Sequence, residues 1–193
     1  MAHIDTFKGW AETIRQDIDA FMALLDSPKA DDHAKKLAGA ALLYLVSRMD
    51  LIPDWNEGIG VIDDVMVLRI AAQLGQSHPR GDLDATHDRS LDRMANQADA
   101  IQQFLGGPLY DKLKAYVAKL SDVAVRGRTP GALLDDAKLR RDLKVEIDDE
   151  VKKTVPIVIN DAMDAELRLK VFQKSFLCLI RLTYNAIPGA LLK

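Results

Sequence analysis

An aspartate-rich interruption of an apolar helical stretch constrains the fold of this chain more than any other feature. The segment Asp50-Leu51-Ile52-Pro53-Asp54 is followed nine residues later by Asp63-Asp64. Pro53 disfavours helical geometry at the residue before it, so the helix that precedes it should end near residue 50. Gly58 and Gly60 then let the chain turn, and a second helix should begin near residue 61. The pattern predicts a helical hairpin whose loop gathers several carboxylates.

Helical periodicity continues along the rest of the chain. Apolar residues recur at three- and four-residue steps, which is the spacing of one face of an α-helix. The expected helices include residues 7–25, 28–46, 61–74, 91–105, 108–120 and 133–143. Ile157-Val158-Ile159 is prone to form a strand, but no second strand is visible, so we interpret it as the start of a long final helix through Leu182. We expect an all-α bundle of about seven helices with the aspartate-rich hairpin at its centre.

Turn-forming residues mark the expected ends of these helices. Ser27 is the expected N-cap of the second helix, with Pro28 as its first residue. The small residues 38–41 in that helix predict close approach by another helix. Residues 126–131 are the strongest linker signal. We expect a single helical domain over residues 1–193, with a sub-boundary near 125–131 as the alternative, which would separate a core bundle (1–125) from C-terminal helices (132–193).

Composition excludes several classes of protein. Of the 193 residues, 48% are apolar and 28% are charged, which is ordinary for a globular chain and too polar for a membrane-embedded one. A net charge of -3 and a pI near 5.8 give no electrostatic reason to expect a nucleic-acid partner. The most apolar stretch, 171–192, is interrupted by charged residues and Pro188, so we expect no transmembrane segment. The first residues lack the features of a signal peptide, which makes the cytoplasm the expected location.

The carboxylates of the hairpin allow two interpretations. Aspartates at helix starts and in turns accept hydrogen bonds from free backbone N–H groups, so the loop can be acid-rich only to hold a tight connection. Alternatively, Asp50, Asp54, Asp63 and Asp64 bind a hard divalent cation such as Mg²⁺ or Ca²⁺. We favour the structural interpretation, because clustered acids mark a functional site in only some proteins.

The spacing of these acids matches no metal-binding loop that we can justify. Asp54 could begin a loop like that of an EF-hand, but the glycine comes one residue early and position twelve is Val65 instead of glutamate. The histidines are scattered in polar surroundings, which indicates surface residues rather than zinc ligands. They are His3, His33, His78 and His87. The sequence therefore predicts no metal ligand set and no cofactor.

The motif also resembles a known family. Tyr44 and Ser47 near a helix end, Asp-Leu-Ile-Pro-Asp at 50–54, Gly60, and then Asp63-Asp64 resemble the YkvA-like family, a domain of unknown function, over roughly residues 38–72. Arg48 and Glu57 stand where that family usually has proline. The resemblance implies a fold module and no catalytic residue, because the family has none established. The candidate site, structural or cation-binding, consists of Asp50, Pro53, Asp54, Gly60, Asp63 and Asp64.

These observations favour a non-enzymatic function. We expect a helical module that binds a partner protein, a second copy of itself or a membrane surface, and the alternative is a carboxylate-metal hydrolase that uses the four aspartates. The C-terminal helix is the candidate contact surface, because its apolar residues cover more of its circumference than docking on one core requires. The alternative, which we favour because it accounts for Cys178 and Phe176 together, is that these apolar residues lie fully buried at the centre of the bundle. These residues are Val171, Phe172, Phe176, Leu179, Ile180 and Leu182.

Overall fold

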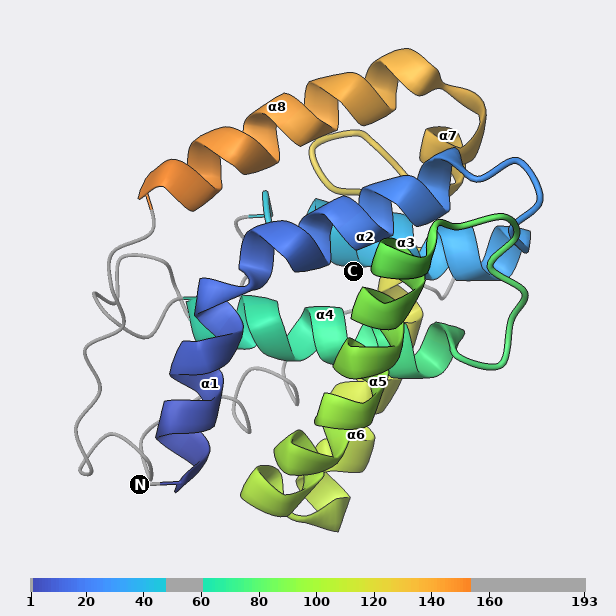
Figure 1. Ribbon diagram of the computed structural model, residues 1–193. Coiled ribbons are helices and arrows are strands. Elements are labelled where there is room, and N and C mark those ends of the chain that lie inside the picture. Colours follow the sequence, from blue (N-terminus) through green and yellow to red (C-terminus); the bar gives the residue numbers. More distant parts are fainter. Residues whose placement is uncertain (1, 48–60, 154–193) are drawn as a thin grey trace, which may run out of the picture.

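The computed structural model describes residues 2–47 and 61–153, and these residues form an all-α bundle, as predicted (Figure 1). The described residues contain eight helices instead of about seven, because two of the expected helices are each broken into a pair. The expected final helix lies outside the described residues. The helices are α1 (Ala2–Glu12), α2 (Ile14–Asp26), α3 (Asp32–Tyr44), α4 (Val61–Gly75), α5 (Ala85–Leu105), α6 (Gly107–Leu120), α7 (Pro130–Asp135) and α8 (Ala137–Lys153).

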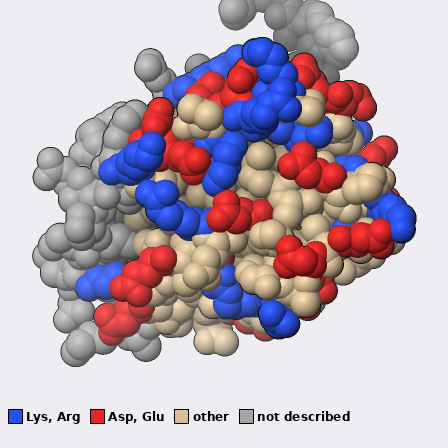
Figure 2. Space-filling view, turned by 45° about the horizontal axis from the view of Figure 1, so that its top comes forward, with Lys and Arg blue, Asp and Glu red and all other residues tan. Residues whose placement is uncertain are grey.

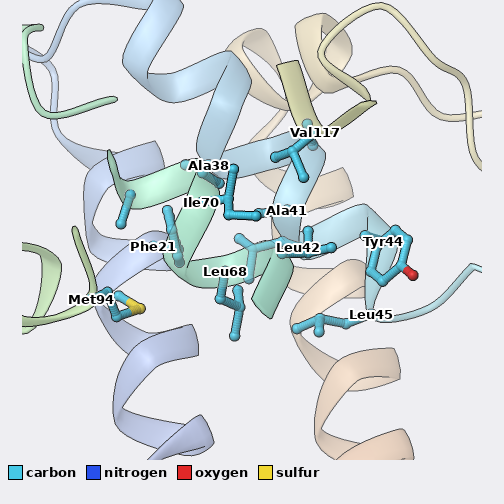
Figure 3. Close-up of a cluster of buried hydrophobic side chains, with 14 of the residues drawn as sticks. Phe21, Ala38, Ala41, Leu42, Tyr44, Leu45, Leu68, Ile70, Met94 and Val117 are labelled. Carbon is cyan, nitrogen blue, oxygen red and sulfur yellow. The ribbon is translucent and has the colours of Figure 1, made fainter. Parts of the chain in front are cut away.

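Helix α4 is the centre of the bundle. It packs against α1, α3, α5 and α6, and most of its residues from Val61 to Ala72 are buried. A helix that is apolar around its whole circumference is stable only when other helices surround it. Leu68 and Ile70 of α4 lie among Phe21, Leu42 and Met94, which come from α2, α3 and α5 (Figure 3). The hairpin of α3 and α4 is therefore central, as the sequence predicts.

The first expected helix is divided at Thr13. The Thr13 hydroxyl donates a hydrogen bond to the Trp10 carbonyl at 3.0 Å, and the Thr13 backbone N–H bonds the same oxygen at 3.1 Å. Helix α1 ends at this turn and α2 begins after it, but the spacing of apolar residues continues unchanged across the turn. Periodicity alone therefore predicts one continuous helix. The break lets α1 turn away from α2 and lie beside α4 (Figure 1).

The predicted N-cap of the second helix is wrong. Helix α3 begins at Asp32, and the Asp31 carboxylate accepts hydrogen bonds from the N–H groups of His33 (2.9 Å) and Ala34 (3.3 Å). Ser27 instead donates through its hydroxyl to the Arg80 carbonyl at 3.2 Å. Asp31 and Ser27 are both good N-cap residues, so local preference does not decide between them. The hydrogen bond of Ser27 to Arg80, in the segment that follows α4, leaves Asp31 as the N-cap of α3.

The expected helix 133–143 is divided at Asp136. The Asp136 carboxylate accepts hydrogen bonds from the N–H groups of Lys138 (2.8 Å) and Leu139 (3.1 Å), and so caps a new helix, α8. Before this break, α7 lies against α3. A Cβ atom built on Gly39 would lie 3.2 Å from Leu133 Cδ1 and 3.5 Å from the backbone of Pro130. The close approach predicted from the small residues of α3 is confirmed.

None of the helices in the described ranges is both long and apolar enough to cross a membrane.

Candidate functional site

Two residues of the aspartate motif bond to each other across the helical hairpin. Tyr44 is the last residue of α3, and Asp63 is the third residue of α4. The Tyr44 hydroxyl donates a hydrogen bond of 2.5 Å to the Asp63 carboxylate, and both side chains are buried. Burial, and after it the charge of Asp63, raises the pKa of the Tyr44 hydroxyl well above its usual value of 10. The pair joins the two ends of the hairpin on the inside of the bundle.

The described part of the motif is directed into the protein. Ser47 is buried, as are Tyr44 and Asp63, and Asp64 is half-buried. The remaining candidate residues, Asp50, Pro53, Asp54 and Gly60, lie outside the described residues. Among the described motif residues, Tyr44 and Asp63 are thus in direct contact across the hairpin.

Comparison with known proteins finds one family model that is similar to part of this hairpin. Residues 34–69 match the family model described as a protein of unknown function, DUF1232. The match confirms the predicted resemblance to a domain family of unknown function. It covers residues 34–69, whereas the motif indicated residues 38–72. No curated protein and no solved structure matches the chain. The DUF1232 segment contains most of α3 and the first part of α4, so its described residues are mostly core residues.

The histidines lie apart from the DUF1232 hairpin contact. His87 bonds the Asp84 carboxylate at the start of α5, and His3 packs beside the rings of Phe7 and Phe104. The rings of His33 and His78 are 4.7 Å apart, and Nδ1 of His78 lies 3.2 Å from the Asp31 carboxylate. Within residues 2–47 and 61–153, no group of three or more histidine, cysteine, aspartate or glutamate side chains could hold a metal ion.

A buried charge network, not predicted from the sequence, lies on the other side of α4. Asp17 of α2 and Arg69 of α4 are both fully buried, and Arg69 Nη2 lies 3.1 Å from Asp17 Oδ2. Arg93 of α5, whose side chain is 31% exposed, bonds the other oxygen of Asp17 at 2.5 Å and the Thr13 hydroxyl at 3.1 Å. One carboxylate thus joins two guanidinium groups, and three helices meet at it.

Arg69, the last residue of the DUF1232 match, has further partners in the core. Its Nε donates to the Gln97 side chain at 3.0 Å and its Nη1 to the Val65 carbonyl at 3.1 Å. The guanidinium carbon lies 4.4 Å from the centre of the Trp10 ring, which is a cation–π contact. Burial lowers the pKa of Arg69 to about 10, and Asp17 opposes this change, so the group stays charged at neutral pH.

The sequence does carry a signal for this network. Asp17 falls on the apolar stripe of α2, three residues after Ile14 and four before Phe21, and Arg69 interrupts the apolar sequence of α4. Charged residues are rarely fully buried without a partner, so two of opposite sign on apolar helix faces indicate a pair. Which helices meet is a property of the tertiary fold, and the pattern does not predict it.

We expect the Tyr44–Asp63 hydrogen bond to stabilise the hairpin. Asp63→Ala leaves the buried Tyr44 hydroxyl without this acceptor and should lower the free energy of unfolding by about 1–3 kcal/mol. Urea melts measure the loss. Tyr44→Phe and the double variant complete a double-mutant cycle, and additive losses would show that the hydrogen bond contributes nothing.

The raised pKa of Tyr44 predicts a stability change at high pH. Above pH 10 an unfolded tyrosine loses its proton while folded Tyr44 keeps it, so the folded state binds more protons and stability falls as pH rises. Tyr44→Phe should be less stable at pH 7 but lose less stability between pH 9 and 11. Urea melts across that range measure the slope. Equal slopes in the two proteins would contradict the assignment.

Proposed function

We propose that this protein is a non-enzymatic binding module, in which the helical bundle is a scaffold for contacts with a partner protein or a membrane surface. One observation carries the proposal: the segment that matches the family is used to build the core. Asp63 of the motif is fully buried and bonded to Tyr44, and α4 is the central helix. This arrangement supports a structural use of the motif better than a reaction centre open to substrate.

The scaffold surface is polar. Positive and negative side chains alternate over the face seen in Figure 2, which is typical of a solvated surface. Among the described residues, Val145 is the only large hydrophobic side chain that is exposed. We therefore propose that residues 170–182 supply the contact, since their sequence is apolar and carries Lys170 and Lys174. These residues lie outside the described structure, so this part of the proposal rests on their sequence.

Sedimentation with vesicles and light scattering test the proposal on the full chain. We expect the monomer fraction, purified without refolding, to bind vesicles that contain phosphatidylserine or to self-associate reversibly, and we expect Phe172→Glu to abolish this without a change in the thermal melt. Val145→Glu is the matched control, because it places the same charge at an exposed apolar position of the scaffold. A protein that neither binds vesicles nor self-associates, and that unfolds on Phe172→Glu, would overturn the proposal.

The hydrolase alternative makes a different prediction. A cation site built from Asp50 and Asp54 should raise the melting temperature when Mg²⁺ is added, by mass action on the folded state. Asp54→Asn should then remove the increase. We expect no such dependence. A Mg²⁺-dependent increase that Asp54→Asn abolishes would favour the hydrolase.

A further inference from the structure

A strained turn connects the main bundle to its last two described helices. The Val125 backbone N–H donates to the Arg128 carbonyl at 2.8 Å, and the Arg128 N–H donates to the Val125 carbonyl at 3.0 Å. The two residues between them have positive φ, 50° at Arg126 and 78° at Gly127. Glycine adopts this conformation readily, whereas a residue with a side chain is strained there. Among the described residues other than glycine, Arg126 alone has a positive φ.

The helices after this turn form one unit. The Arg140 guanidinium donates to the carbonyls of Leu133 (2.7 Å) and Leu134 (3.1 Å), which joins the start of α8 to the end of α7. These bonds fix the corner at Asp136. If the unit separates from the bundle, residues 130–153 should therefore move together, and the turn 125–128 is the place where the chain can open.

The unit contacts the rest of the bundle through a complementary surface. Helix α8 lies along α2 (Figure 1), and Leu143 and Ile147 are fully buried. Charged pairs cross the boundary, from Arg140 to Asp26 at 2.6 Å and from Lys144 to Asp19 at 2.8 Å. In the structure this surface of the bundle is covered by the chain's own residues 130–153. The same residues of a second copy would therefore fit it equally well.

We propose that residues 130–153 exchange between two copies of this chain, with the turn 125–128 opening as the hinge. Symmetric exchange keeps every contact that the unit makes with α2 and α3, because each copy receives an identical unit. Opening the turn releases the backbone strain at Arg126, and strained short hinges favour exchange. The inference does not depend on the proposed function, which uses residues 170–182.

Substitutions in the hinge test the proposal. Gly127→Ala adds strain to the closed turn only, so we expect the dimerisation constant to rise roughly tenfold for each of the two hinges opened. Gly106→Ala is the control outside the hinge: Gly106 also has a positive φ (80°), and at neither glycine does an added Cβ meet an atom within 4 Å. Because Gly106 combines this φ with a ψ of 155°, a conformation essentially restricted to glycine, Gly106→Ala should lose at least as much stability as Gly127→Ala without forming more dimer. Arg126→Gly should lower the dimer fraction. Sedimentation velocity after refolding at several concentrations measures all three.

Cross-linking of the wild-type protein tests the exchange directly. Chains labelled with ¹⁵N and unlabelled chains are unfolded together, refolded and treated with a carbodiimide, which joins Lys144 to Asp19 without a spacer. Exchange predicts mixed-label Lys144–Asp19 peptides in the dimer fraction, also in the Phe172→Glu protein. Same-label peptides only, or a Gly127→Ala protein that dimerises no more than Gly106→Ala, would overturn the proposal.

Discussion

Asp17→Asn should lower the free energy of unfolding by about 3–5 kcal/mol, the cost of leaving a buried charge without its partner. The substitution keeps the size of the side chain and removes only its charge. Arg69 is then left charged and fully buried, with neutral contacts from Gln97, the Val65 carbonyl and the Trp10 ring. Urea denaturation followed by Trp fluorescence would measure the loss.

Removing Arg69 should destabilise the protein less than removing the charge of Asp17. Arg69→Met leaves Asp17 bonded to Arg93 and Thr13, so the carboxylate keeps a positive partner. The loss should therefore be smaller than for Asp17→Asn. The double variant Asp17→Leu with Arg69→Met replaces both charges by apolar groups and should be more stable than the sum of the single losses predicts. If the losses simply add, the pair is not coupled and its assignment as the junction of three helices is wrong.

The network also shows what a single sequence can and cannot predict. The stripe from Ile14 to Leu25 predicts a helix because apolar spacing is a local property, and α2 has this stripe on its buried face. Asp17 lies on the same face, yet its partners are 52 and 76 residues away, on α4 and α5. No local pattern encodes such a distance.

Several predicted helix boundaries were wrong for the same reason. Ser27 and Asp31 are each suitable N-caps, and the contact of Ser27 with Arg80 leaves Asp31 as the cap of α3. Thr13 and Asp136 break helices through bonds that leave the apolar pattern unchanged. In contrast, the start of α4 at Val61 was predictable, because proline and glycines before it leave few alternatives. The contact between Tyr44 and Asp63 was not predicted, although both residues belong to the recognised motif.

Gly81→Ala should be the second most damaging of these substitutions, because two separate effects add at this position. Gly81 has a φ of 70°, which costs a residue with a side chain about 1–2 kcal/mol. An added Cβ would also lie 2.7 Å from the Ala30 nitrogen and 2.8 Å from the Lys29 carbonyl carbon. Backbone atoms cannot move aside as a side chain can, so overpacking should cost roughly 1–3 kcal/mol more.

The consequence should reach beyond the turn itself. Gly81 belongs to the segment that holds the start of α3, where the Asp31 N–H donates to the Pro79 carbonyl at 2.8 Å. Gly127→Ala is the matched control, since its φ is 78° and nothing lies within 4 Å of the added Cβ. We expect Gly127→Ala to show the strain alone and Gly81→Ala to lose roughly 2–5 kcal/mol in urea melts. Amide exchange in α3 should also accelerate in Gly81→Ala only. Equal losses in the two variants would mean that the segments around Ser27 and Gly81 are not in close contact.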